Sequence, residues 1–94
     1  MTDLIAALTK YVSVLAASAE HTARADDRTA YTRHLAEAAR MFAALHAGDE
    51  ETFRERIAAE RRAYGWGFLS GDAGVAAEAA FDALARLVES QTVT

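Results

Sequence analysis

The chain contains no cysteine and no proline, and both absences constrain its architecture. Without cysteine, no disulfide can staple a small domain and no thiolate can act as a nucleophile. Without proline, no residue forces a helix to kink or end. Large side chains are also scarce, because 24 of the 94 residues are alanine, the strongest helix former, which adds little buried area. We therefore expect one helical domain over residues 1–94, with a frayed tail at 91–94.

Basic residues are outnumbered, with 10 lysines and arginines against 14 acidic residues and a net charge of −4. Nucleic-acid binding depends on basic side chains that neutralise phosphates, so this balance argues against a nucleic-acid partner. No apolar run approaches the roughly 18 residues of a membrane span. The apolar segment 4–20 is of signal-peptide length, but Asp3 and Lys10 contradict that interpretation. We expect a cytoplasmic protein that binds no membrane.

Apolar residues recur at intervals of three and four along four segments, which is the spacing of amphipathic helices. The predicted helices span about 3–22, 27–47, 50–64 and 73–90. With no strand signal, they predict an all-α fold, a small antiparallel helical bundle that is closed within the chain or completed by dimerisation. The boundary between the first two helices rests on charge alone, so one continuous helix from 3 to 47 is the alternative. The inward faces are expected to carry Leu4, Leu8, Tyr11 and Leu15; Tyr31, Leu35, Ala38, Phe42 and Leu45; Phe53, Ile57 and Tyr64; and Ala77, Phe81, Leu84 and Val88.

The third predicted helix begins at the clearest boundary in the chain. Gly48 suits the left-handed position after a helix, and Asp49 suits the N-cap of the next helix. The helix itself is strongly charged, and we interpret it as a lid at the edge of the core. Two pairs of opposite charge stand four residues apart, the spacing for pairing along a helix: Glu50 with Arg54, and Arg56 with Glu60.

Residues 63–74, AYGWGFLSGDAG, hold four of the five glycines and the single tryptophan. This segment matches neither of two common phosphate-binding motifs, the dinucleotide-binding motif and the Walker motif. Ser70 stands where the dinucleotide motif needs its third glycine, and Asp72 follows Gly71 where the Walker motif needs its lysine. Ser70 or Asp72 instead suits the cap of the last helix. Trp66 and Phe68 either close the end of the bundle or form an exposed interface.

The sequence offers no convincing catalytic or metal site. Di-iron bundles need Glu-x-x-His pairs, whereas this chain has one reversed His34-x-x-Glu37. His34 and His46 flank the apolar stripe of the second predicted helix at opposite borders, and His21 points away on the first, so the three histidines do not converge. No serine stands in a nucleophile elbow. General acid or base catalysis would need buried carboxylates, and the helical pattern places nearly all of them outside. We therefore expect no metal and no cofactor, and favour a protein that is not an enzyme.

Two functional hypotheses remain. The first is a non-enzymatic interaction module, of a regulatory, inhibitor or immunity-like kind, that binds another protein and itself forms a dimer. It would use the third helix and the aromatic residues after it: Arg54, Arg61, Arg62, Tyr64, Trp66 and Phe68. The second is a small-ligand-binding bundle with a pocket between the first two helices, lined by Tyr11, Tyr31, His34 and Phe42. A metal-dependent enzyme is the least favoured alternative.

Overall fold

Four helices account for nearly all of the chain. The structure is a computed structural model, and it describes residues 2–22, 25–65 and 71–92. The helices are α1 (Thr2–His21), α2 (Ala25–Ala47), α3 (Glu50–Gly65) and α4 (Gly71–Thr92). No strand occurs among these described residues, so the predicted all-α bundle of four helices is confirmed. Each helix begins and ends within two residues of its predicted bounds.

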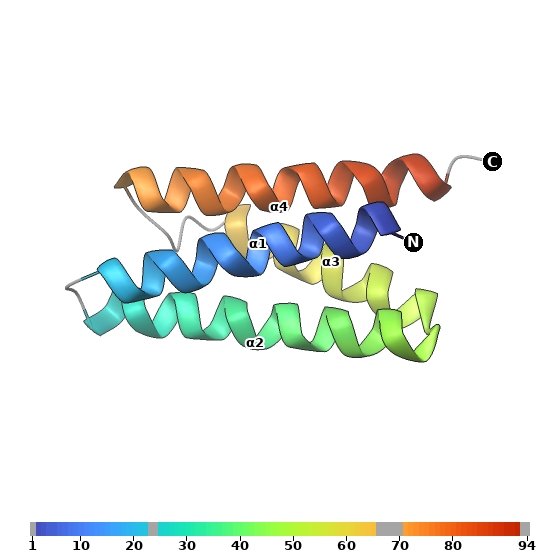
Figure 1. Cartoon of the computed structure of the whole chain (residues 1–94), viewed down its shortest axis with the longest axis horizontal. Coiled ribbons are helices and arrows are strands. Elements are labelled where there is room, and N and C mark those ends of the chain that lie inside the picture. The colour runs from blue at the N-terminus through green and yellow to red at the C-terminus, as the bar shows by residue number, and fades with distance from the viewer. Residues whose placement is uncertain (1, 23–24, 66–70, 93–94) are drawn as a thin grey trace.

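The first two helices are separate, and the alternative of one continuous helix is wrong. α1 ends at His21 and α2 begins at Ala25, and the two run antiparallel (Figure 1). Asp26 and Asp27 lie in the first turn of α2. Carboxylates are favourable there because the free N–H groups give the start of a helix a partial positive charge.

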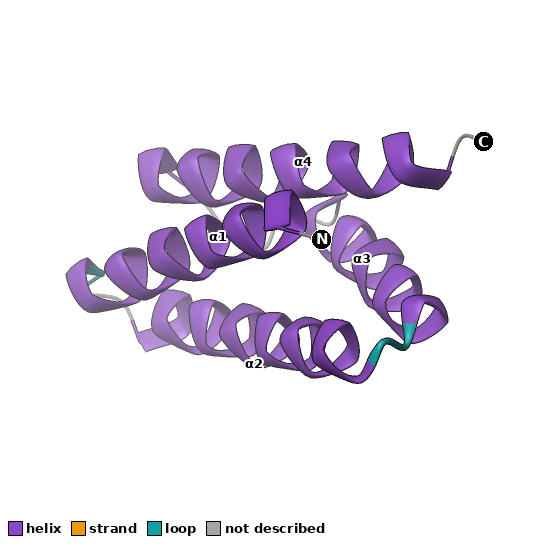
Figure 2. Ribbon diagram, turned by 45° about the vertical axis from the view of Figure 1, so that its right-hand side comes forward, coloured by secondary structure: helices purple, strands orange, loops and turns teal. Residues whose placement is uncertain are grey.

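α1 is the central helix of the bundle. It packs against α2 on one side and α4 on the other, so that these three helices form one layer (Figure 1). α3 packs mainly against α2 and touches α4 over fewer residues, and it is inclined to the other three helices (Figure 2). With extents of 43 × 21 × 19 Å, the bundle is about twice as long as it is wide. The inclined α3 sets the geometry of the site described below.

The core follows the predicted inward faces of α1 and α4. Leu8, Tyr11, Leu15 and Leu84 are completely buried, and Phe81 is nearly so. Along each of these two helices the core residues are spaced by three and four, which keeps them on one side of a helix with 3.6 residues per turn.

The buried face of α2 is rotated from the predicted one. Its buried residues are Tyr31, His34, Ala38, Met41 and Ala44. The predicted core residues Leu35, Phe42 and Leu45 are only partly buried and pack at the edge of the core. The centre of the face therefore runs through His34, a polar residue that the apolar pattern placed at the border.

The turn between α2 and α3 is built as predicted. Gly48 has a φ of 74°, the left-handed conformation that glycine adopts without a steric penalty. The N–H of Gly48 donates to the carbonyl of Leu45 at 3.1 Å and that of Asp49 to the carbonyl of Ala44 at 2.9 Å, the two bonds of a Schellman motif. Asp49 Oδ1 accepts the Thr52 N–H at 3.2 Å. The hydrogen bond from the Thr52 hydroxyl, together with this N-cap bond, lowers the pKa of the Asp49 carboxyl.

Candidate functional site

Four polar side chains from three helices meet inside the bundle. Tyr11 comes from α1, His34 from α2, and Glu60 and Tyr64 from α3; we call them the Glu60 cluster. Glu60 is 3% exposed and His34 5%. A carboxylate is almost never so deeply buried unless it is paired. The bonds of Glu60 therefore define the site.

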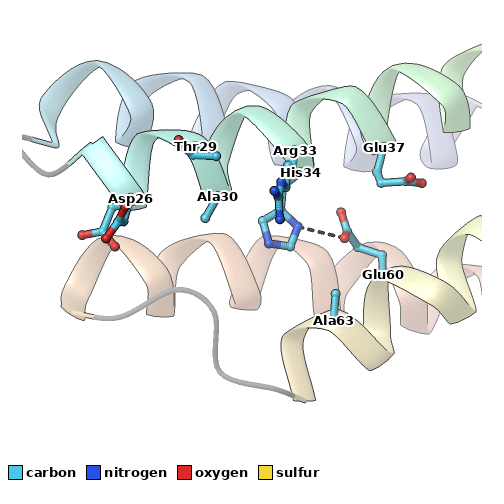
Figure 3. A pocket seen from close by; sticks show the side chains of 9 residues that line it. Asp26, Thr29, Ala30, Arg33, His34, Glu37, Glu60 and Ala63 are labelled. Atoms are coloured by element: carbon cyan, nitrogen blue, oxygen red, sulfur yellow. Dashed lines mark hydrogen bonds and ion pairs between the residues drawn. The ribbon is translucent and has the colours of Figure 1, made fainter.

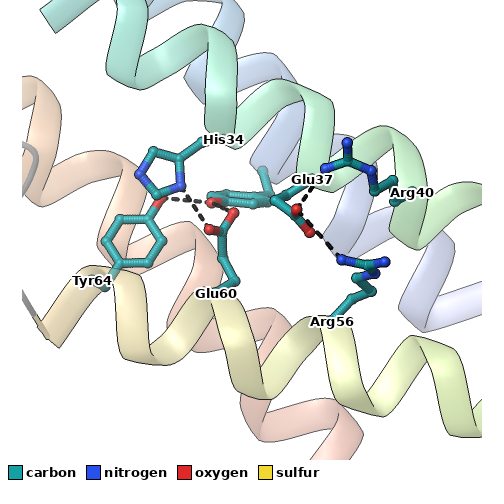
Figure 4. Close-up of polar contacts among 7 residues, drawn as sticks. His34, Glu37, Arg40, Arg56, Glu60 and Tyr64 are labelled. Carbon is teal, nitrogen blue, oxygen red and sulfur yellow. Dashed lines mark hydrogen bonds and ion pairs between the residues drawn. The ribbon is translucent and has the colours of Figure 1, made fainter.

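Both carboxylate oxygens of Glu60 are hydrogen-bonded (Figure 4). Oε1 lies 2.8 Å from Nδ1 of His34, and Oε2 accepts the hydroxyl of Tyr11 at 2.9 Å. The Tyr11 oxygen in turn lies 2.6 Å from the Tyr64 hydroxyl. Because Tyr11 has one proton and gives it to Glu60, the Tyr64 hydroxyl is the donor to Tyr11. The cluster is thus a continuous hydrogen-bonded chain that ends on the carboxyl group of Glu60.

The two phenols of the cluster are held in their protonated form. Burial is the main cause that raises the pKa of Tyr11 far above its ordinary value, and the neighbouring Tyr64 and Glu60 raise it further. Burial also raises the pKa of Tyr64, partly offset by its hydrogen bond with Tyr11. Ionisation would place a second negative charge beside Glu60 in a region poor in water. Both tyrosines therefore remain hydrogen-bond donors at neutral pH.

Aromatic stacking fixes the plane of the His34 ring. Its centroid lies 4.7 Å from that of Tyr64, with 21° between the planes. On its other side Tyr64 stacks on Phe81 of α4, with centroids 5.2 Å apart and planes at 24°. Stacking and the Glu60 bond together leave the imidazole a single orientation.

A pocket of about 410 Å³ opens beside the cluster, between α2 and α3 (Figure 3). His34 and Glu60 form its inner wall, and Ala30 and Ala63 face each other across it. Small side chains at these two positions leave the space open. The pocket is lined by Asp26, Asp27, Thr29, Ala30, Arg33, His34, Glu37, Glu60 and Ala63.

His34 presents one ring nitrogen to this pocket. Nδ1 is bonded to Glu60, and Nε2 lies on the side of the ring away from Glu60, where Ala30 also lies (Figure 3). In the neutral tautomer that donates from Nδ1 to Glu60, Nε2 carries the lone pair and accepts hydrogen bonds. Among the described residues no group bonds Nε2. The pocket wall thus contains an oriented ring nitrogen that no described residue engages.

Glu37 is a second acceptor in the pocket wall. Its Oε1 pairs with Arg40 at 2.6 Å and with Arg56 at 3.7 Å (Figure 4). Its Oε2 is buried, and no donor from the described residues reaches it.

The predicted pair of Arg56 with Glu60 is wrong, because Glu60 points into the bundle and Arg56 reaches across to Glu37 of α2. The predicted pair of Glu50 with Arg54 is present at 3.7 Å.

The residues of the hypothetical ligand pocket are only partly brought together. Tyr11 and His34 belong to the Glu60 cluster, and Tyr31 is buried nearby in the core. Phe42 lines a different surface groove, with Ile5, Leu45 and His46. The pocket that contains His34 lies between α2 and α3, whereas the sequence placed it between the first two helices.

The residues that the sequence predicted as a protein interface do not all lie on one surface. Arg54, Arg61 and Arg62 lie on the exposed side of α3. Arg61 is held by α4 through Glu89 at 3.1 Å and Asp82 at 3.7 Å. Tyr64 turns inward and belongs to the Glu60 cluster. Trp66 and Phe68 lie outside the described residues.

Glu60 was missed by sequence reasoning because it was interpreted as a surface charge. A signal was present, since Glu60 follows Phe53 and Ile57 at intervals of four and three, with Tyr64 four residues later. Those intervals place it on the buried face of α3.

In the described part of the chain, no three potential metal ligands lie together.

Comparison of the chain with protein-family models, with curated proteins and with solved structures finds no match. Among the described helices none has the length and apolar content needed to cross a membrane. Function is therefore inferred from the site alone.

Proposed function

We propose that this protein binds a small molecule in the pocket between α2 and α3, with His34 as the central contact. The observation that carries the proposal is the imidazole itself, which is almost completely buried and fixed by Glu60 and Tyr64. Its second ring nitrogen faces a pocket of about 410 Å³, within the range of roughly 300–1,000 Å³ that is typical of small-molecule sites.

A purely structural role explains the Glu60 cluster less well. Buried ionic and polar groups add little net stability compared with apolar residues of similar volume, because removing them from water costs several kcal/mol per ion. A leucine at position 34 would pack against Tyr64 without requiring Glu60. What the polar cluster supplies is an imidazole with a defined orientation, which presents one ring nitrogen to the pocket. Pre-organised groups of this kind reduce the entropic cost of binding.

The structure offers less support for the other hypothesis, in which the protein is an interaction module that binds another protein. Arg61 is engaged by Asp82 and Glu89, Arg54 pairs with Glu50, and Tyr64 belongs to the Glu60 cluster, so three of the proposed contact residues have structural partners. Arg54 and Arg62 are exposed on the outer side of α3. Binding of a protein through this helix, and dimerisation of the chain, both stay predictions. The small-ligand hypothesis is the stronger one, although its pocket lies beside α3.

A fragment screen on the isotope-labelled protein tests the proposal. We expect at least one small polar fragment to shift the amide resonances of Ala30, His34 and Ala63 in a saturable manner. Ala63→Leu would fill the pocket and abolish these shifts, whereas Ala58→Leu, on the exposed face of the same helix, would leave them unchanged. If no fragment bound at millimolar concentration, or if Ala63→Leu left binding unchanged, the proposed function would be wrong.

A further inference from the structure

We infer that the ligand of the α2–α3 pocket is a small uncharged molecule that carries a hydroxyl group on an apolar body. This inference rests on the proposed function and adds the chemical class of the ligand. Three features of the pocket support it: the ring nitrogen of His34, the pairing of the charged side chains beside it, and the methyl groups of Ala30 and Ala63.

The first feature is that Nε2 of His34 serves in either hydrogen-bonding role. The bond between Nδ1 and Glu60 at 2.8 Å forms both in the neutral ring with its proton on Nδ1 and in the imidazolium ion. Nε2 accepts a hydrogen bond in the first state and donates one in the second. A hydroxyl group both accepts and donates through one oxygen atom, so it bonds Nε2 in each state, whereas a carboxamide divides these roles between two atoms. A carboxylate only accepts and an ammonium group only donates, so each of them fits one state alone.

The second feature is that the charged groups of the inner wall already compensate one another. Glu60 is bonded to His34. Glu37 pairs through Oε1 with Arg40 at 2.6 Å and with Arg56 at 3.7 Å. The Oε2 atom of Glu37 is sealed from solvent, so a ligand in the pocket does not reach it. A charged ligand group would therefore lose its hydration at the inner wall without gaining an uncompensated opposite charge.

The charged groups at the rim of the pocket favour neither sign of ligand charge. Asp26 and Arg33 are both exposed and carry opposite charges, and Asp27 already takes part in another interaction. Ion pairs between solvent-exposed groups contribute little to binding or stability. The rim thus gives a cation or an anion no advantage that would offset the cost at the inner wall.

The third feature is the apolar surface of the pocket. Ala30 and Ala63 face each other across it (Figure 3), and both are partly buried. Their small methyl groups leave room for an apolar body, whose removal from water stabilises the complex. A hydroxyl group at the imidazole and an apolar body between the two alanines together describe a small alcohol.

A titration with four probes that share one aromatic ring tests the inference on the intact, isotope-labelled protein. The probes are benzyl alcohol, toluene, benzylamine in its ammonium form, and benzoate, and the amide resonances of Ala30, His34 and Ala63 report binding. We expect benzyl alcohol to bind saturably at neutral pH. Benzylamine and benzoate should bind at least about tenfold more weakly, because each would lose hydration without a compensating charge.

The imidazole resonances of His34 report the contact with the hydroxyl group. Long-range proton–nitrogen spectra resolve the two ring nitrogens and also give the proton state of the ring. We expect benzyl alcohol to shift the Nε2 resonance of His34 and toluene to leave it nearly unchanged. The ring nitrogens of His46, at an exposed position of α2 away from the pocket, should not respond to either probe.

A substitution at His34 measures the same contact by affinity. His34→Asn keeps a donor where Nδ1 stands and removes the ring nitrogen that faces the pocket. One hydrogen bond between uncharged groups corresponds to about a two- to tenfold change in affinity. We therefore expect the ratio of benzyl alcohol affinity to toluene affinity to fall by about this factor. His46→Asn is the matched control and should leave the ratio unchanged.

Failure of this inference is distinguishable from failure of the proposed function. If benzylamine or benzoate bound as tightly as benzyl alcohol, the pocket would be a ligand site but not a site for an uncharged alcohol. If benzyl alcohol left Nε2 of His34 unshifted, or if His34→Asn left the affinity ratio unchanged in the folded variant, the contact with His34 would be wrong. If a screened fragment bound and none of the four probes did, the inference would be wrong and the proposed function would stand.

If neither the four probes nor any screened fragment bound, both proposals would be wrong. Should His34→Asn unfold the protein, the probe series and the imidazole resonances of the native chain still decide the inference.

Discussion

Tyr11 and Tyr31 are both buried tyrosines of the core, 0% and 2% exposed, and they differ in what their hydroxyl groups do. The Tyr11 hydroxyl donates to Glu60 and lies in hydrogen-bond contact with Tyr64. The Tyr31 hydroxyl makes no hydrogen bond with any described residue. The effect of a buried hydroxyl group on stability therefore depends on its hydrogen-bond partner. Leaving a buried partner unsatisfied costs more free energy than one formed hydrogen bond contributes.

Tyr11→Phe removes that hydroxyl with little change of volume. Glu60 Oε2 would lose its donor inside the bundle, so we expect the free energy of unfolding to fall by about 1–3 kcal/mol. Urea denaturation followed by circular dichroism measures the change. Tyr31→Phe is the matched control and should alter stability much less. Equal effects of the two substitutions would show that the Glu60 cluster contributes nothing specific to stability.

At the scale of elements, the junction of α2 and α3 determines where α3 lies and so where Glu60 points. Gly48 ends α2 in the left-handed conformation, and Asp49 starts α3 through its bonds to Thr52. Nothing lies within 4 Å of the position that a Cβ atom would occupy at Gly48. Glycine is needed there for its backbone conformation and not for space.

Gly48→Ala tests that distinction. Alanine at a positive φ costs roughly 1–2 kcal/mol, and no steric clash adds to it, so we expect a loss of stability of that size. Gly48→Asn should cost less, because asparagine tolerates the left-handed conformation. Thermal unfolding of the three proteins gives the order glycine, asparagine, alanine from most to least stable. An alanine variant as stable as the native protein would mean that the turn adopts another conformation in solution.

At the scale of the whole molecule, burial of the two cluster phenols couples folding to alkaline pH. The pKa values of Tyr11 and Tyr64 are raised in the folded state, whereas exposed tyrosines in the unfolded chain titrate near pH 10. Above about pH 10 the unfolded state therefore binds fewer protons than the folded state. By linkage, the stabilisation is complete below pH 10 and is lost as the pH rises further.

Urea unfolding at a series of pH values from 8 to 11 measures this coupling. Each group contributes a slope of up to about 1.4 kcal/mol per pH unit above pH 10. The double variant Tyr11→Phe/Tyr64→Phe should start from a lower stability at pH 8 and lose less of it by pH 11. Parallel pH profiles for the two proteins would contradict the assignment of both phenols to the buried cluster.

Features that depend on neighbours along the chain can be read from the sequence alone. The spacing of apolar residues defined four helices to within two residues at each end and the inward faces of α1 and α4. Gly48 and Asp49 determined the turn between α2 and α3. These features are local, because backbone conformation, capping and helical periodicity involve residues at most a few positions apart.

The chemistry of the interior depends instead on how the helices pack against one another. His34 and Glu60 are 26 residues apart and lie on different helices. Taken alone, each is a polar residue whose burial is unfavourable, and so the sequence placed His34 at a border and Glu60 outside. The approach of the inclined α3 to α2 makes their burial favourable, since each supplies the partner that the other needs. The same approach leaves space between Ala30 and Ala63, so both the oriented imidazole and its pocket arise from helix packing.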